Sequence, residues 1–305
     1  MYIYIATAFI SLILIKISLV LCKKNKILSI VFEILALTIP CVIAALRDYS
    51  VGTDVLFYQK PYFDDALYSD NLLNYLHTEG HNVEQLYFLL TWVCAKLSNR
   101  MSLLFFCIEA LIIVPVYISL KMYMKKDNDL ILGIFIFFTF WYNCSLNMAR
   151  QSIALAFCIL TFACLEQNKN KKAILFTIIA FLFHSSAIFM IPALILYFIM
   201  KSKIKIKYKI LIIWLISLII VAFLFCFKEI LNQSLNFFKE GTIGYRYANY
   251  VNKYSTAANF QMREMLWCII FIIITIKKKN SIENYTDNYY FYLLCIILTF
   301  LRIIS

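Results

Sequence analysis

Residues 210–227 read ILIIWLISLIIVAFLFCF, a run that is apolar apart from Ser217. A helix of this length is suited to the hydrocarbon core of a bilayer. The run does not alternate polar and apolar residues, as the strands of a membrane β-barrel would. Similar runs recur along the 305 residues, of which 63% are hydrophobic, whereas a soluble globular chain is about half apolar. The sequence therefore predicts an all-α polytopic membrane protein.

We expect a single integral membrane domain over residues 1–305, with about 10–11 transmembrane helices. The expected spans cover residues 2–21, 27–45, 84–98, 102–120, 129–143, 149–166, 172–184, 187–200, 209–227, 262–276 and 288–305. The first run has no basic segment before it, which favours an uncleaved span whose N-terminus lies outside.

Lysine and arginine gather between the apolar runs, at residues 22–26, 166–172, 201–208 and 277–280. This pattern is typical of cytoplasmic loops. It places residues 46–83 outside as the first extracytoplasmic loop and residues 228–261 as the second. The short basic loops also account for the net charge of +12 without a nucleic-acid partner.

It is open whether the run at 84–98 crosses the membrane, and the answer decides on which side the next loop lies. Full crossings at both 84–98 and 102–120 would carry the basic cluster 121–126 to the outside. Either 84–98 is a short re-entrant or interfacial helix, or the cluster breaks the positive-inside rule. We favour the first interpretation, because the run is short and carries Glu84, Gln85 and Lys96.

The pattern of ligand-forming residues gives no sign of a cofactor. The ten cysteines lie almost entirely in apolar runs without a CxxC spacing, and no metal-ligand cluster or glycine-rich phosphate loop is present. The first outer loop instead mixes carboxylates with aromatic rings, which suits sugar binding. The second repeats this character around Tyr245 and Arg246, where an interfacial tyrosine belt is the alternative.

Three short motifs fall on the expected outer face. The first runs from Arg47 to Asp54 and is followed by Tyr58; its Gly52 predicts a turn with positive φ or close backbone approach, presenting Thr53. A helix-ending turn with a local Arg–Asp pair is the alternative.

The second motif is Asn147-x-x-Arg150-Gln151, whose spacing places all three side chains on one helical face. A cation at bilayer depth costs about 2.5–3.5 kcal/mol, so Arg150 is a functional-site hypothesis. Arg150 near a helix N-terminus predicts an anion site, with snorkelling to the headgroups as the alternative. The third motif, Phe183-His184-Ser185-Ser186, places an imidazole in a tight outer turn, where it is either structural or a proton carrier.

Together these motifs, in this order and spacing over about residues 40–200, resemble the EpsG family, within the wider group of Wzy-type polysaccharide polymerases. The resemblance implies a GT-C-like, Wzy-like architecture. It also implies that undecaprenyl-pyrophosphate-linked oligosaccharide units are polymerised into capsular or extracellular polysaccharide at the outer face of the bacterial cytoplasmic membrane. A flippase and a chain-length regulator of the same pathway are the partners to expect. Family members usually continue further, so the natural protein is either short or carries additional C-terminal spans.

The resemblance also suggests roles for individual residues. Arg150, with Arg47 as second cation, would hold the donor pyrophosphate, and His184 or Asp54 would be the general base. We prefer His184, because an Asp54 buried beside Arg47 would lose basicity. The expected catalytic residues are thus His184, Asp54 and Arg150, and the expected substrate-binding residues are Arg47, Gly52, Thr53, Tyr58, Asn147, Gln151, Tyr245 and Arg246.

Two other functions fit a chain of this kind. One is a GT-C-type glycosyltransferase using a lipid-phosphate sugar, or an acyltransferase that modifies the polysaccharide; Asp48 and Asp54 leave it open. The other is a flippase of the lipid-linked unit, which should show two related halves and charges buried across the membrane.

Overall fold

The computed structural model describes residues 2–77, 84–205, 208 and 215. The chain divides into two units, Met1–Ile188 and Phe189–Ser305. The expected spans at 209–227, 262–276 and 288–305 lie outside the described residues apart from Leu215, as do the loop 228–261 and its Tyr245 and Arg246.

The described residues form helices joined by short turns, without a strand among them, which confirms the all-α prediction. The first unit contains α1 (Tyr2–Leu21), α2 (Lys26–Ala45), α3 (Lys60–Tyr68), α4 (Leu72–His77), α5 (Gln85–Leu97), α6 (Ser102–Tyr123), α7 (Asp127–Ile136), α8 (Tyr142–Ser145), α9 (Ala149–Glu166) and α10 (Asn170–Phe183). A π-helical turn at Val55–Gln59 precedes α3, and another at Phe137–Trp141 joins α7 to α8. A 3-10 turn, Ser185–Phe189, follows α10, and α11 (Met190–Lys201) belongs to the second unit.

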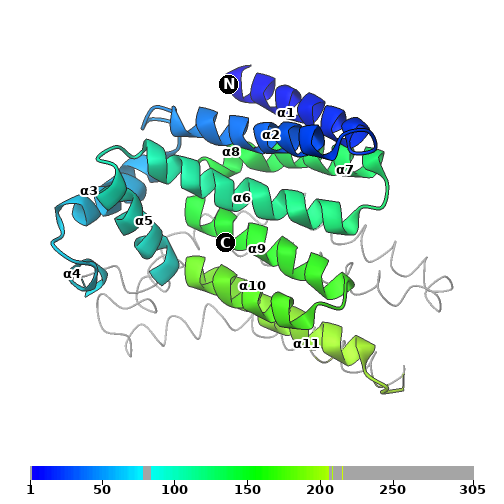
Figure 1. Cartoon of the computed structure of the whole chain (residues 1–305). Coiled ribbons are helices and arrows are strands. Elements are labelled where there is room, and N and C mark those ends of the chain that lie inside the picture. The colour runs from blue at the N-terminus through cyan, green and yellow to red at the C-terminus, as the bar shows by residue number, and fades with distance from the viewer. Residues whose placement is uncertain (1, 78–83, 206–207, 209–214, 216–305) are drawn as a thin grey trace, which may run out of the picture. The chain divides into compact units, whose positions relative to one another are not determined.

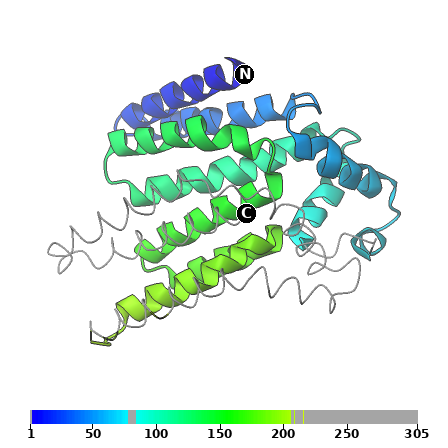
Figure 2. The same cartoon turned by 180° about the vertical axis from the view of Figure 1, so that it is seen from behind.

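Helices α1, α2, α6 and α9 are long and apolar enough to cross a membrane. The most buried of them is α9, which packs between α6 and α10 (Figures 1 and 2). Its most apolar window is 67% buried, against 28% for α1 and for α2. Small residues on α9, such as Ser152, Ala156 and Ala163, allow this close packing. The apolar faces of α1 and α2 remain exposed within the first unit, as expected of helices that face lipid.

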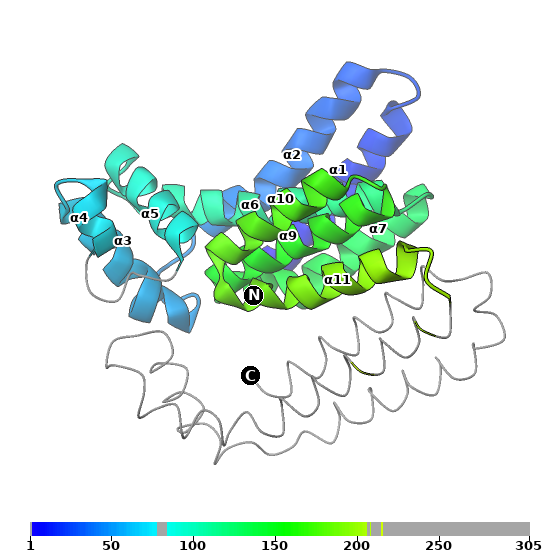
Figure 3. The ribbon, with the colours of Figure 1, turned by 90° about the horizontal axis from the view of Figure 1, so that it is seen from below.

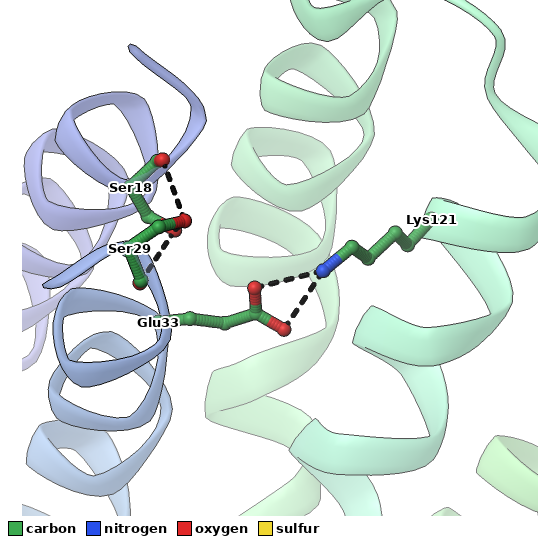
Figure 4. Close-up of polar contacts among 4 residues, drawn as sticks. All are labelled: Ser18, Ser29, Glu33 and Lys121. Carbon is green, nitrogen blue, oxygen red and sulfur yellow. Dashed lines mark hydrogen bonds and ion pairs between the residues drawn. The ribbon is translucent and has the colours of Figure 1, made fainter. Parts of the chain in front are cut away.

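The basic loops lie at one end of these helices. There Lys121 of α6 contacts both carboxylate oxygens of Glu33 of α2, at 2.9 and 2.7 Å (Figure 4). Ser18 and Ser29 exchange hydrogen bonds beside this pair and join α1 to α2. Because Gln167 also donates to the backbone carbonyl of Met122, the basic segments after α1, α6 and α9 all meet at the same end.

The length and position of α5 indicate whether the run at 84–98 crosses the membrane. Helix α5 has 13 residues and is about 20 Å long, too short to cross a hydrocarbon core of about 30 Å. It packs with α3 and α4 at the end opposite the basic loops (Figures 1 and 3). The chain therefore leaves α2 and enters α6 at that same end, in agreement with a re-entrant or interfacial helix.

Segment 46–77 is more ordered than the loop that the sequence predicted. It forms the π turn, α3 and α4, which the chain can build because apolar side chains in this segment have a partner helix. Phe63 and Tyr75 are almost fully buried, and the ring of Tyr75 packs edge-on against Phe88 of α5. Helices α3 and α4 thus pack with α5 at this end of the first unit.

Candidate functional site

The turn after α2 docks on the segment that precedes α9. Gly52 has a φ of +100°, and a Cβ built on it would lie 2.9 Å from the carbonyl oxygen of Leu146. Oδ1 of Asn147 accepts hydrogen bonds from Thr53 Oγ1 at 3.2 Å and from the Asp54 backbone N–H at 3.0 Å. The prediction for Gly52 is confirmed on both counts, positive φ and close approach. The structure therefore brings the first two sequence motifs into contact.

Asn147 does not lie on α9, because that helix begins only after Met148. The prediction that Asn147 shares a helical face with Arg150 and Gln151 is therefore wrong. Gln151 is exposed, whereas Asn147 also accepts a hydrogen bond on its backbone carbonyl from Gln59 Nε2 at 3.3 Å. Asn147 joins the 52–59 segment to the start of α9.

Arg150 occupies the first turn of α9, and 29% of its side chain is exposed. Its Nη1 donates to Glu84 Oε2 at 2.5 Å. The guanidinium carbon lies 6.0 Å from the ring centre of Tyr58 and 5.8 Å from those of Tyr62 and Tyr87. Aromatic faces at this range attract a cation. The tyrosines and the carboxylate together fix the position of the guanidinium.

Glu84 precedes the first residue of α5, and its side chain is only 4% exposed. Besides Arg150 it accepts a hydrogen bond from the backbone of Ser185, and its Oε1 lies 3.5 Å from His184 Nε2. Burial raises the pKa of the Glu84 carboxyl above its usual range, although Arg150 and Ser185 act in the opposite direction. One buried carboxylate thus connects the second sequence motif to the third.

His184 follows α10 directly and faces Glu84. Its Nδ1 accepts the Ser186 backbone N–H at 3.1 Å and lies 2.8 Å from Ser186 Oγ, so in the neutral ring the proton sits on Nε2. Burial, and secondly the charge of Arg150, lower the pKa of His184 to about 4. The contact with Glu84 is therefore between a carboxylate and a neutral N–H at neutral pH, even though its distance alone would also suit an ion pair.

Asp54 lies near Arg150 without forming one of the ion pairs found in the described residues. Its side chain is partly exposed. Burial raises the pKa of its carboxyl above the usual range, and the charge of Arg150 acts in the opposite direction. Of the carboxylates around Arg150, Asp54 is the more exposed to an incoming molecule.

Arg47 belongs to a second, fully buried cluster. Its Nη1 lies 3.5 Å from Glu109 Oε1, both side chains are 0% exposed, and its guanidinium covers the ring of Phe105 at 4.1 Å. Glu109 Oε2 accepts from Ser145 Oγ at 3.2 Å. The expectation that Arg47 lies beside Asp54 and lowers its basicity is corrected: Arg47 pairs with Glu109.

Two carboxylates in these clusters escaped the sequence analysis as site residues. Glu109 stands inside the apolar run 102–120, and such an intramembrane charge is itself a signal of a functional or structural partner. Glu84 carried a weaker signal, as an acid at the start of a short apolar run. Among the described residues, no group of three or more His, Cys, Asp or Glu side chains is arranged to hold a metal ion.

No curated protein matches the chain, and no solved structure matches it either. The family model described as the EpsG family matches residues 30–305, which include every contact described for the Arg150 cluster. The chain therefore belongs to the EpsG family, and this membership suggests a polysaccharide polymerase-like role for a membrane protein.

Proposed function

We propose that this protein polymerises undecaprenyl-pyrophosphate-linked oligosaccharide units into capsular or extracellular polysaccharide at the outer face of the bacterial cytoplasmic membrane. The family membership supports the reaction class. The observation that carries the proposal is the Arg150 cluster: a partly exposed guanidinium, set among a carboxylate and three tyrosine rings. The cluster lies at the opposite end of the helices from the basic loops, which is the outer end by the positive-inside rule.

Arg150 is the residue that holds the donor. Its forked donors suit pyrophosphate oxygens, and its place in the first turn of α9 adds the helix N-terminus to the attraction for an anion. As the sugar C1–O bond to the pyrophosphate breaks, negative charge grows on the departing lipid pyrophosphate. A fixed cation stabilises that charge without having to reorganise.

Asp54 is the base that this geometry favours. The acceptor hydroxyl attacks C1 of the donor sugar, its proton passes to the Asp54 carboxylate, and the polymer moves to the acceptor unit. A raised pKa makes a carboxylate a better base at neutral pH. His184 is less suited, because its Nδ1 accepts the Ser186 backbone N–H and its Nε2 faces Glu84, so both ring nitrogens are already in use. We therefore reverse the preference drawn from the sequence.

The other predicted residues divide into contacts and supports. Thr53 and Tyr58 are exposed and belong to the substrate-binding surface. Gly52 and Asn147 shape that surface through the docked turn. Arg47 is enclosed with Glu109 and supports the fold instead of acting as a second cation for the donor.

Replacement of Arg150 by Ala and by Lys tests the proposal in the host. We expect long polymer to disappear and single lipid-linked units to accumulate on the outer leaflet. The Lys variant should recover little, because an ammonium cannot form the bidentate contact. Arg100→Ala is the matched control, since Arg100 is exposed in the turn between α5 and α6.

Three outcomes would contradict this function. Normal polymer length in the Arg150→Ala strain would remove Arg150 from the site. Units that accumulate on the cytoplasmic leaflet would point to a flippase instead. Unchanged chain length with altered polymer decoration would favour the acyltransferase alternative.

A further inference from the structure

Arg150 is already neutralised in the free protein. Glu84 Oε2 contacts its Nη1 at 2.5 Å, and the Glu84 side chain is 4% exposed. An anion that reaches Arg150 must therefore displace a carboxylate of this chain. A site that simply attracted anions would leave the guanidinium open, so the presence of Glu84 calls for a reason.

The surroundings supply the reason. A guanidinium at the headgroup level of a membrane faces a large excess of anionic phospholipids, whose phosphodiester carries one negative charge. Because those headgroups are in large excess over the donor, an Arg150 without Glu84 would be occupied mainly by them. Specificity against an abundant competitor commonly requires an element that disfavours the competitor, and a competing internal carboxylate is such an element.

Glu84 keeps other contacts when an anion displaces it from Arg150. Its Oε1 faces His184 Nε2 at 3.5 Å, and the backbone of Ser185 donates to the carboxylate. The guanidinium in turn is kept in place by the rings of Tyr58, Tyr62 and Tyr87. The Glu84 carboxylate can therefore release Arg150 and keep its contacts with His184 and Ser185, while the guanidinium stays among the tyrosine rings.

We infer that Glu84 is a specificity residue: its carboxylate keeps singly charged phosphodiester headgroups from binding Arg150, but it is displaced by the doubly charged pyrophosphate of the donor lipid. A pyrophosphate diester carries one charge on each phosphate, so it outcompetes the singly charged carboxylate of Glu84. A phosphodiester carries only one charge, the same as the carboxylate, and does not displace it. This inference rests on the proposed function only in taking pyrophosphate as the ligand of Arg150.

Binding in nanodiscs of defined lipid composition tests the inference. The full chain is placed in phosphatidylcholine discs with or without phosphatidylglycerol, and the Kd of a fluorescent short-chain prenyl pyrophosphate sugar, a pyrophosphate diester like the donor, is measured. For the wild type we expect phosphatidylglycerol to weaken binding less than about twofold. For Glu84→Gln we expect tighter binding in neutral discs and a loss of about tenfold when phosphatidylglycerol is added, equivalent to about 1.4 kcal/mol.

Two further variants complete the design. Asp70→Asn removes the same charge from an exposed position after α3 and should behave as the wild type, which controls for surface potential. Glu84→Asp keeps the charge with a shorter reach and should show intermediate sensitivity, so the inference stays testable if Glu84→Gln does not fold. Equal sensitivity of the wild type, Glu84→Gln and Glu84→Asp to phosphatidylglycerol would overturn it.

The proposed function fails in a different way. If Arg150→Ala binds the prenyl pyrophosphate sugar as tightly as the wild type, Arg150 is not the anion site and the proposed function loses its central residue. If Arg150→Ala abolishes binding while the Glu84 variants keep the wild-type selectivity, only the inference about Glu84 is lost.

Discussion

Loss of Glu109 should destabilise the protein more than loss of any exposed charge, because it leaves Arg47 buried without a counter-ion. Both side chains are 0% exposed, and they lie 3.5 Å apart. Within the described residues, Nε, Nη1 and Nη2 of Arg47 have no hydrogen-bond partner. The carboxylate of Glu109 is therefore the main compensation for the buried guanidinium.

The magnitude follows from this geometry. Two unit charges 3.5 Å apart attract by about 5 kcal/mol at an effective dielectric constant of about 20. Removing one member of a buried pair typically costs about 3–5 kcal/mol. We expect Glu109→Ala to lower the free energy of unfolding by that amount. Glu109→Gln should cost nearly as much, since it keeps a polar contact for Ser145 but removes the charge.

Equilibrium unfolding of the purified chain in mixed detergent micelles, followed by circular dichroism, measures this loss. Glu33→Ala is the matched control, because the Glu33–Lys121 pair is partly exposed, at 24% and 49% (Figure 4). Exposed pairs contribute about 0–1 kcal/mol. The double variant Arg47→Met with Glu109→Leu should recover most of the loss, because a buried pair with poor geometry is often no better than apolar packing.

The result that would refute this reasoning is a loss for Glu109→Ala no larger than that for Glu33→Ala. Failure of the double variant to recover stability would show instead that the pair is needed for the fold in its own right.

Three further predictions concern the outer end of the first unit. Gly52→Ala should cost about 1–3 kcal/mol in the same unfolding assay, from positive φ and the contact with Leu146; Gly133→Ala, which meets only a flexible leucine side chain, should cost clearly less. Asn147→Ala removes two hydrogen bonds from the 53–54 turn and should cost about 1–3 kcal/mol, with a matching loss of polymer in the host; stability equal to the wild type would contradict the docking. For His184, whose pKa is lowered to about 4, the unfolded chain binds the extra proton between pH 6.5 and 4, so stability should fall as pH falls through this window. His184→Asn should remove up to about 3 kcal/mol of that dependence, and an unchanged pH profile would refute it.

The spans of the first unit could be predicted closely from the sequence, because hydropathy is a local property of each membrane-spanning segment. The expected span 149–166 coincides with α9, and the expected 2–21 coincides with α1. The segment 46–83 could not be predicted in the same way. The helices within its described part, 46–77, are short, and they depend on packing against α5.

The candidate site was only partly predictable for the same reason. Gly52, Asn147, Arg150 and His184 stood out as unusual residues at the ends of apolar runs. Their partners did not: the two ends of the Arg150–Glu84 contact are 66 residues apart in the chain. Sequence spacing does not show which distant helices pack against each other. The sequence analysis therefore paired Arg47 with its neighbour Asp54, whereas in the structure Arg47 pairs with Glu109.

The sequence by itself determined that this chain is a multi-pass helical membrane protein, and it selected the residues of the outer-end motifs. Hydropathy and charge are properties of individual residues, so their patterns can be recognised from the sequence without knowing the fold. Only the tertiary structure decided which charge neutralises which, because in a low-dielectric interior that depends on a few ångströms between distant segments. Those distances pair Arg150 with Glu84 and Arg47 with Glu109, and they leave the half-buried Asp54 outside both pairs.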